Sequence, residues 1–399
     1  MKWEKKKLCE CTEYITDGDH QPAPKADKGV HFIKIKDIVN NQVSFDAQVY
    51  VPQEYYDNLP MERKPQKEDV LYTVVGSFGI PSYVQTDELF CFERNIALLH
   101  PNKDIEPRFL YYSLKNPAFY KGVEIVANGS AQKLIPLSKL KDLKISVPDK
   151  EAQHRIADIL SVYDNLIENN QKQIKLLEEA ARRLYKEWFV DLRFPGHENK
   201  KIVDGVPEGW SKSTVSEVSA VLRRGISPKY NEKARGIVIN QKCIRQTIVS
   251  YDEARTQEKK YPAELEMMES DIVICSTGAG TLGRVGQIFE AKGNATLDSH
   301  VTLIRANEKI GQQSLFWSLK MQQDYLMSAG KGSTNQLELS RETIGSCEIL
   351  IPERKIAEQV EKNFVAIHNK MKECSMQIAR LREARDLLLP KLMSGEVEV

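Results

Sequence analysis

Two long stretches of the chain carry apolar residues at alternating spacings of four and three positions. The first stretch, about residues 151–189, has its stripe at Ile156, Leu160, Tyr163, Ile167, Asn170, Ile174, Leu177, Ala181, Leu184 and Trp188. The second, about residues 353–394, has its stripe at Ile356, Val360, Ile367, Met371, Cys374, Ile378, Leu381, Leu388 and Leu392. This spacing is typical of long helices that pack through one apolar face. We therefore expect two long helices whose stripes cover each other as an antiparallel coiled coil; helices packed on their own globular domains are the alternative.

Details of the two stretches refine this expectation. Neither stretch contains an internal glycine, and proline enters only at Pro390. The polar Asn170 on the first stripe would help to fix the register of the helices, at some cost in stability. Eight residues separate Pro148 from Ile156, whereas only four separate Pro352 from Ile356. We therefore expect the two helices to start differently.

The rest of the chain carries short apolar runs of strand type, and these runs occur twice in the same order. Trp3 precedes Gly18 as Trp210 precedes Gly225, and an offset of 202 to 207 residues relates every matched segment. The further matches are residues 32–38 with 238–244, 67–84 with 269–288, 93–102 with 298–307, 110–116 with 315–321, 128–134 with 331–337, and 145–148 with 348–352. Repeats of this kind indicate duplicated structural units.

The repeat sets the expected fold class. We expect an α+β protein with two repeated globular domains, residues 1–149 and 193–352. Residues 150–192 and 353–399 would form the long helices between and after them, with pseudo-two-fold symmetry.

One repeated segment has the spacing of a dinucleotide-binding loop. Residues 271–288 read DIVICSTGAGTLGRVGQI, so that Gly278, Gly280 and Gly283 form a G-x-G-x-x-G, with Asp298 downstream. The first copy lacks this spacing and has Pro81 where a phosphate-binding helix would have to run. We therefore expect a tight hairpin turn in both copies, whose glycines let the backbone approach a neighbour closely.

Composition limits the class of protein but does not identify a binding partner. The 399 residues have a net charge of +1, which neither requires nor excludes nucleic acid. No apolar run has the length of a membrane span and the N-terminus lacks the pattern of a signal peptide, so we expect a cytoplasmic protein. The seven scattered cysteines form no C-x-x-C pair, which argues against a disulfide framework or a zinc ribbon. We interpret Cys9 and Cys11 as strand positions on one face.

Several sequences resemble catalytic motifs but fail in their context. Residues 116–119, Asn-Pro-Ala-Phe, depart from the adenine methyltransferase motif at Ala118 and lie in a helical pattern. Residues 258–260, Glu-Lys-Lys, lack the acidic partner of a nuclease site, and residues 329–334, AGKGST, lack the first glycine of a phosphate loop. We therefore expect no catalytic residue, no metal site and no cofactor in this chain.

The repeated turns instead carry polar side chains that suit DNA. Lysine, serine, threonine and backbone N–H groups can bind phosphates, whereas asparagine, glutamine and arginine match base edges. Ordinary solvated turns remain the alternative. The candidate DNA-binding residues are Lys34, Lys36, Ser77, Phe78, Arg94, Ser130, Gln132, Lys133, Asn240, Lys242, Thr281, Arg284, His300, Lys331, Ser333, Thr334, Asn335 and Gln336.

Two segments resemble a known family. LYKEWFVDLRFPGHE, residues 184–198, and LLLPKLMSGE, residues 387–396, resemble the ends of the two conserved helices in specificity subunits of type I restriction-modification systems. The G-S/T-x-G turns and the Ile-Pro before each helix are similar to that family as well, and the resemblance covers essentially the whole chain.

The resemblance implies a non-catalytic DNA-recognition subunit. Each target recognition domain would read one half of a bipartite, asymmetric site, and the helices would set the spacer and dock two methyltransferase subunits. Those partners would bind S-adenosylmethionine and methylate adenine, and restriction subunits using ATP and Mg would add cleavage. The near-neutral charge suggests that DNA affinity depends on these partners. A self-contained DNA adenine methyltransferase and a coiled-coil scaffold without a nucleic-acid role are the competing hypotheses.

Overall fold

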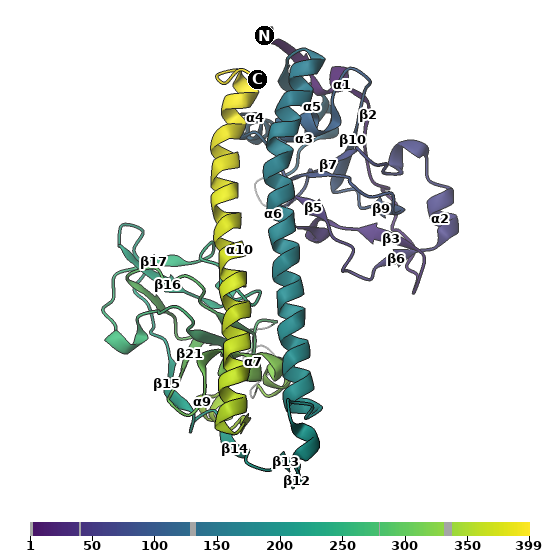
Figure 1. Ribbon diagram of the computed structural model, residues 1–399. Helices are drawn as coiled ribbons and strands as arrows, with labels where there is room; N and C mark the ends of the chain where they lie inside the picture. The colour runs from purple at the N-terminus through teal and green to yellow at the C-terminus, as the bar shows by residue number, and fades with distance from the viewer. Residues whose placement is uncertain (1–2, 40, 128–132, 279, 331–336) are drawn as a thin grey trace. The chain divides into compact units, whose positions relative to one another are not determined.

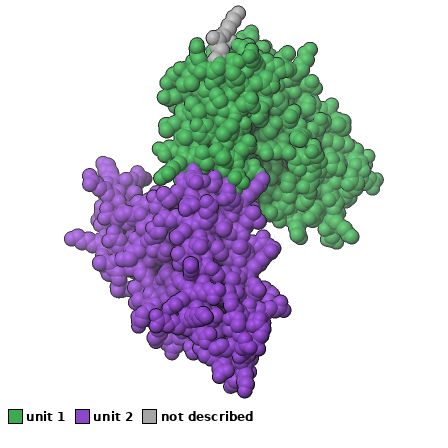
Figure 2. Space-filling view, in the orientation of Figure 1, with its two compact units in different colours: residues 1–169, 378–399 green, residues 170–377 purple. Residues whose placement is uncertain are grey.

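The chain forms two compact units, shown in different colours in Figure 2. Unit 1 comprises residues 1–169 and 378–399, and unit 2 comprises residues 170–377. Unit 1 is therefore built from two separate segments of the chain. The computed structural model (Figure 1) describes residues 3–39, 41–127, 133–278, 280–330 and 337–399.

Unit 1 contains two main sheets. A four-stranded antiparallel sheet has the order β2-β10-β7-β8, and a three-stranded sheet has the order β6-β3-β9, in which β3 and β9 run parallel. Two short strand pairs, β1 with β11 and β4 with β5, complete the unit. The strands are β1 (Glu4–Lys7), β2 (Thr12–Asp17), β3 (Val30–Ile33), β4 (Ile38–Val39), β5 (Gln42–Val43), β6 (Tyr50–Val51), β7 (Val70–Thr73), β8 (Pro81–Tyr83), β9 (Phe90–Phe92), β10 (Ile96–Pro101) and β11 (Lys144–Val147).

Unit 2 repeats the topology of both main sheets and of the β1–β11 pair. Its four-stranded sheet has the order β15-β21-β18-β19, its three-stranded sheet has the order β17-β16-β20, and β14 pairs with β22. The strands β16 and β20 are again parallel, which confirms the duplication inferred from sequence. The strands are β12 (Ile202–Val203), β13 (Val206–Pro207), β14 (Ser211–Thr214), β15 (Ser219–Arg224), β16 (Gly236–Ile239), β17 (Arg255–Gln257), β18 (Ile272–Cys275), β19 (Val285–Gln287), β20 (Ala295–Leu297), β21 (Val301–Ala306) and β22 (Glu348–Ile351).

Helices cover the sheets of each unit and include two long ones, α6 and α10. Apart from these two, the described helices are short, and no described helix is both long and apolar enough to span a membrane. The helices are α1 (Leu8–Cys11), α2 (Gln53–Asp57), α3 (Pro107–Lys115), α4 (Pro117–Val126), α5 (Leu137–Asp142), α6 (Lys150–Tyr185), α7 (Gln312–Met321), α8 (Gln323–Ser328), α9 (Arg341–Gly345) and α10 (Arg354–Ser394). A π-helical turn, Lys186–Val190, continues α6.

The long helices pair in antiparallel fashion inside each unit. In unit 1, Arg385 near the end of α10 forms an ion pair of 2.5 Å with Asp164 in α6, and Leu392 shares a core with Ile156. In unit 2, the end of α6 and the start of α10 contribute Ala181 and Val360 to one core. All the stripe residues predicted above are buried or partly buried, so the predicted helices and their packing are confirmed.

The expectation that the two helices start differently is wrong. Both begin two residues after their proline, α6 at Lys150 and α10 at Arg354. Ala152, which is fully buried, takes the stripe position that Ile356 occupies in the second helix. Alanine is a weak apolar signal, so the sequence pattern does not show that the stripe begins at Ala152, in the first turn of α6.

The interpretation of Cys9 and Cys11 as strand positions on one face is also wrong. Both lie in the single helical turn α1, where Cys11 is buried and Cys9 is exposed. The backbone has to turn here because β1 and β2 belong to different sheets.

The G-x-G-x-x-G segment forms the predicted hairpin. After β18 the chain turns directly into the antiparallel β19, and β7 and β8 do the same in unit 1. A Cβ on Gly283 would lie 2.4 Å from the backbone nitrogen of Met327 in α8, so the turn lies tightly against a helix. The Asn-Pro-Ala-Phe sequence is helical as expected, and Asn116 caps α4 by accepting a hydrogen bond from the Ala118 N–H at 3.0 Å.

Candidate nucleic-acid interface

Three of the candidate turns meet at one edge of unit 2. The hairpin turn between β18 and β19 reaches the short helix η5 (Gln241–Cys243), because the Thr281 hydroxyl donates to Gln241 Oε1 at 3.1 Å. The same turn reaches the turn between β20 and β21, where Thr277 Oγ1 lies 2.7 Å from His300 Nδ1. Residues that are far apart in sequence thus form one surface.

The chain that follows the fourth candidate turn is tied to the same edge. The Leu339 N–H donates to the carbonyl of Ser276 at 2.8 Å, directly beside the hairpin turn. The candidates in the fourth turns themselves, Ser130, Gln132, Lys331, Ser333, Thr334, Asn335 and Gln336, lie outside the described residues.

Unit 1 brings the equivalent turns together through hydrogen bonds of its own. The Val74 N–H donates to the carbonyl of Asn95 at 2.9 Å, and the Gly76 N–H donates to the carbonyl of Lys133 at 3.2 Å. The Ile35 N–H donates to Glu93 Oε1 at 2.8 Å, which joins the short helix η1 (Ile35–Asp37) to the next turn. The fold therefore builds this edge twice from equivalent segments, which we call the reading edge of each unit.

Among the described residues, the Lys36 and Lys242 side chains have no hydrogen-bond or ion-pair partner, whereas the amide of Asn240 does. Lys36 and Lys242 are exposed at equivalent positions of η1 and η5, and Lys34 is half-buried beside Lys36. The Asn240 amide is used at both ends, since Oδ1 accepts from the Lys242 N–H at 2.8 Å and Nδ2 donates to the Glu253 carbonyl at 2.7 Å. Asn240 thus holds the start of η5 in this structure.

The hairpin turn of unit 1 carries an aromatic side chain at its tip. Phe78 stacks on Tyr120 of α4 with ring centroids 5.9 Å apart, and the Lys133 ammonium lies 5.6 Å from the Phe78 ring centroid. Ser77 beside it is exposed, and Arg94 is exposed in the turn between β9 and β10. These four candidates therefore share the reading edge of unit 1.

The candidates at the reading edge of unit 2 divide into structural and free groups. The Thr281 hydroxyl also donates to the Thr277 carbonyl at 3.1 Å, and the His300 N–H donates to Asp298 Oδ1 at 2.9 Å, so both residues shape the turns. Burial raises the pKa of Asp298 despite this hydrogen bond. The half-buried Arg284 guanidinium makes no hydrogen bond or ion pair within the described part of the chain, so it remains free to bind a ligand.

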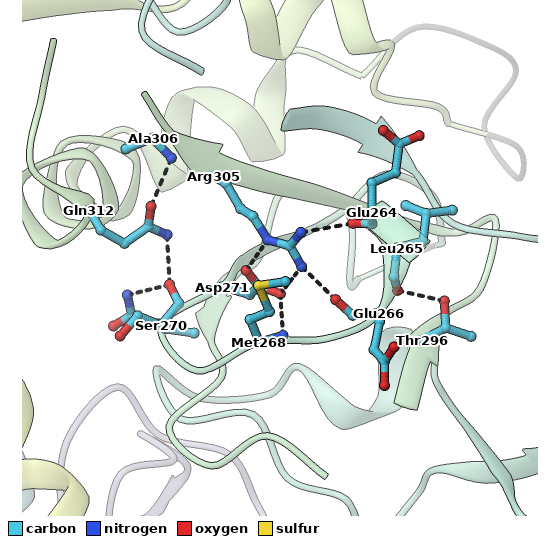
Figure 3. Close-up of polar contacts among 11 residues, drawn as sticks. Glu264, Leu265, Glu266, Met268, Ser270, Asp271, Thr296, Arg305, Ala306 and Gln312 are labelled. Atoms are coloured by element: carbon cyan, nitrogen blue, oxygen red, sulfur yellow. Dashed lines mark hydrogen bonds and ion pairs between the residues drawn. The ribbon is translucent and has the colours of Figure 1, made fainter. Parts of the chain in front are cut away.

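Sequence reasoning missed an ion pair at the opposite end of the strands β18 and β21 from the reading edge. Arg305 of β21 binds Asp271 through Nε to Oδ1 at 2.6 Å and through Nη2 to Oδ2 at 2.8 Å (Figure 3). Its guanidinium also donates to the carbonyls of Glu264 at 2.9 Å and Glu266 at 2.5 Å. Arg305 therefore ties the segment between β17 and β18 to the four-stranded sheet. Alignment of the two repeats could have identified Arg305, because His100 occupies the same position in β10 and lies 2.6 Å from Asp69.

A groove of about 560 Å³ lies beside the hairpin turn of unit 1, between Gly79, Pro117 and Tyr120. Burial lowers the pKa of Lys115, which lines the groove, to about 8. Its counterpart Lys320 in α7 is likewise buried, with its pKa lowered to about 8, and donates to the Val285 carbonyl at 2.7 Å. Both lysines hold helices to their own units. No group of three or more His, Cys, Asp or Glu side chains suited to a metal ion occurs among the residues that could be described.

Comparison with known proteins gives one consistent answer. The family model described as "Type I restriction modification DNA specificity domain" matches residues 1–179. The chain is 25% identical to the type I restriction enzyme HindI specificity subunit of Haemophilus influenzae, over 92% of this chain and 94% of that protein. It is 28% identical to the MjaIX specificity subunit of Methanocaldococcus jannaschii, over 77% of this chain and 72% of that protein.

A solved structure supports the fold. The crystal structure of a type I restriction-modification S subunit from M. genitalium superposes with a TM-score of 0.59. The match covers 98% of this chain and 96% of that one, at 19% sequence identity.

Proposed function

We propose that this chain is a specificity subunit of a type I restriction-modification system and that its two reading edges select the DNA sequence on which such a system acts. Each unit reads one half of a bipartite, asymmetric site. The two units share a topology but little sequence, which supports different sequences for the two half-sites.

The observation that carries this proposal is the convergence of the same turns at one edge in both units. Hydrogen bonds between Thr281 and Gln241 and between Thr277 and His300 fix the edge of unit 2 before any ligand binds. A surface that is already ordered loses less conformational entropy on binding. The edge thus offers prearranged polar groups, as recognition of base pairs requires.

The residues divide into two roles. Lys36, Lys242 and Arg94 are exposed cations and contact phosphates, which position the protein on the duplex. Arg284 reads a base edge, since a free guanidinium can donate two hydrogen bonds to guanine. In unit 1, Ser77, Phe78 and Lys133 also contact the duplex. In unit 2, Thr281, His300 and Asn240 hold the turns of the reading edge in place.

The other parts of the proposal concern assembly. The helices α6 and α10 set the spacer between the half-sites and dock two methyltransferase subunits. Those subunits bind S-adenosylmethionine and carry out DNA methylation after flipping the base. Restriction subunits use ATP and Mg. This chain supplies recognition without chemistry or a cofactor of its own, and the complex works in the cytoplasm.

A map of methylated adenines in the host genome, with and without this gene, tests the proposal. The expected result is that one motif with two short defined halves and a fixed gap loses methylation when the gene is deleted. Replacing residues 193–352 by the same region of a related subunit should then change one half of that motif and leave the other intact. Unchanged methylation in a cell that expresses the methyltransferase subunits would contradict the proposal.

A further inference from the structure

The three-stranded sheets allow the two units to be compared position by position. In unit 1, His31 pairs with Phe90 on one side and with Tyr50 on the other. In unit 2, Ile237 pairs with Ala295 and with Thr256 in the same arrangement. We call residues 20–54 the arm of unit 1 and residues 226–260 the arm of unit 2. The shared register makes the two arms copies of one scaffold.

The two arms differ in charge. The arm of unit 2 has eight Lys and Arg against four Asp and Glu, whereas the arm of unit 1 has four of each. The register places Arg255 where unit 1 has Val49, and the same sequence offset of 206 residues aligns Lys260 with Glu54. Beyond the strands, Arg245 follows η5 where Val39 follows η1. The excess of positive charge therefore does not follow from the fold that the arms share.

Half of the eight cations of the unit 2 arm have no polar partner among the described residues; the other four include the ion pairs Lys229–Glu258 and Arg245–Glu253. Lys233, Arg235, Lys242 and Lys260 are exposed, and their side chains make no hydrogen bond or ion pair with any residue that the structure describes. The Arg255 guanidinium carbon lies 3.5 Å from the centroid of the Tyr230 ring, which is itself 43% exposed. Ion pairs with neighbours would have offset these charges, so their freedom leaves a net positive surface.

The arm is also held in place next to the reading edge. Gln241 of η5 accepts the hydrogen bond from Thr281 of the hairpin turn, and Lys242 is the next residue. Arg305 ties the segment that leaves the arm to the four-stranded sheet (Figure 3). The free cations thus lie on a scaffold that is fixed relative to Arg284 within unit 2, so a duplex on this reading edge would extend its phosphates toward the arm.

We propose that the arm of unit 2, in addition to its helix η5 at the reading edge, binds the phosphate backbone of duplex DNA, and that the arm of unit 1 outside η1 does not. The inference rests on the proposed function and adds an asymmetry to it. Unit 2 supplies most of the sequence-independent affinity, and unit 1 depends on its reading edge alone. Binding through unit 2 is therefore much more sensitive to salt, because each neutralised phosphate releases counterions.

The test uses the full chain copurified with its methyltransferase subunits and a mixed-sequence duplex of about 30 base pairs, long enough for both half-sites one helical turn apart. Fluorescence anisotropy measures the dissociation constant from low to moderate salt. Lys233→Gln/Arg235→Gln/Lys260→Gln removes three cations of the unit 2 arm. Lys25→Gln/Lys28→Gln/Lys67→Gln is the matched control, since these three lysines are exposed in unit 1.

The unit 2 variant should reduce the magnitude of the slope of log K against log salt by about 2 to 3, and each lost contact should weaken binding by about eightfold at 0.1 M salt. The control should keep the wild-type slope. Val49→Arg/Glu54→Lys, which copies the unit 2 charges into unit 1, should increase the slope. Far-ultraviolet circular dichroism of each variant excludes unfolding as the cause.

The outcomes separate this inference from the proposed function. If the unit 2 variant keeps the wild-type slope, or the control loses as much, the arm does not bind phosphates and the inference is wrong, even when the complex still methylates its motif. If the wild-type complex binds no duplex at any salt concentration, both the inference and the proposed function fail.

Discussion

Asp271 accepts two hydrogen bonds from the guanidinium of Arg305, whereas its counterpart Asp69 faces a single imidazole nitrogen of His100 at 2.6 Å. Both carboxyl groups are buried, and each lies immediately before a strand of its four-stranded sheet, Asp69 before β7 and Asp271 before β18. Both units therefore keep a buried carboxyl group at this position but pair it with different side chains. Only the arginine also reaches the carbonyls of the neighbouring segment.

Arg305→Met should destabilise unit 2 by about 3 to 5 kcal/mol, because it leaves the buried Asp271 without its partner. Arg305→Lys keeps the charge but loses the planar fork, so it should lose less stability. Urea unfolding followed by tryptophan fluorescence measures both. Arg245→Met is the control, because the Arg245 side chain is 65% exposed and its ion pair with Glu253 is 3.7 Å long, so it should change stability by less than about 1 kcal/mol. Equal losses in all three variants would contradict this account.

Gly225→Ala should destabilise the protein by about 3 kcal/mol or prevent folding, because a Cβ there would lie 2.1 Å from the carbonyl oxygen of Leu297. The equivalent Gly18 lies against the carbonyl of Phe92 in the same way, at 2.2 Å. Gly293→Ala is the matched control, because no atom lies within 4 Å of its Cβ position. Thermal unfolding compares the two, and an unchanged melting temperature for Gly225→Ala would rule out the steric argument.

His368 should make unit 2 sensitive to acid. The ring is 4% exposed, lies 4.3 Å from Phe289 and has Nδ1 3.1 Å from Gln287 Oε1, and burial lowers its pKa to about 4. Between pH 6.5 and 4 the unfolded chain binds a proton that the folded protein excludes, so stability is full above pH 6.5 and falls as the pH drops. The loss amounts to about 3 kcal/mol.

The His368→Gln variant isolates this effect. It cannot bind the proton, so its unfolding free energy should fall less steeply from pH 6.5 to 4 than that of the wild type. Urea titrations at several pH values measure the slope. Parallel slopes in the two proteins would show that His368 does not carry the acid sensitivity.

Arg284→Ala should relax DNA specificity without unfolding the protein. The Arg284 guanidinium has no hydrogen-bond or ion-pair partner among the described residues, while a bidentate contact to a base pair contributes about 1 to 3 kcal/mol of discrimination. Competition binding with duplexes altered at single base pairs of the mapped motif should show about 5- to 100-fold weaker discrimination at one position. Arg354→Ala, at the start of α10 and outside the reading edge, is the control, because its side chain is 90% exposed. Unchanged discrimination at all positions would remove Arg284 from the reading surface.

The sequence predicts those parts of the fold whose signals are local and periodic. The long helices follow from a stripe that recurs every three to four residues, and the hairpins follow from glycine turns between apolar runs. The parallel pairing of β3 with β9 could not be predicted, because it joins segments that nothing in the local pattern links. The place of Ala152 on the apolar stripe could not be predicted either, because its small side chain gives a weak apolar signal. Packing nevertheless buries it fully.

The location of the candidate site could be predicted from the sequence, but the role of each of its residues could not. Repeated polar turns indicated the surface, but only contacts distinguish Asn240 from Arg284. The Asn240 amide is used at both ends, whereas the Arg284 guanidinium has no polar partner among the described residues. Arg255 was missed because an isolated arginine on a short strand carries no signal until the two arms are compared at equal register. Its ring partner Tyr230 lies 25 residues earlier, and only the fold brings them together.

The division of unit 1 into two segments has a consequence for synthesis on the ribosome. Leu389, Leu392 and Met393 belong to the same core as Leu8 and Ile156, so the nascent first domain cannot close its interior until the last helix has emerged. Unit 2 is one continuous segment that can fold earlier. An elongating chain therefore passes through a stage in which the domain made first is still incomplete and exposes apolar surface to chaperones.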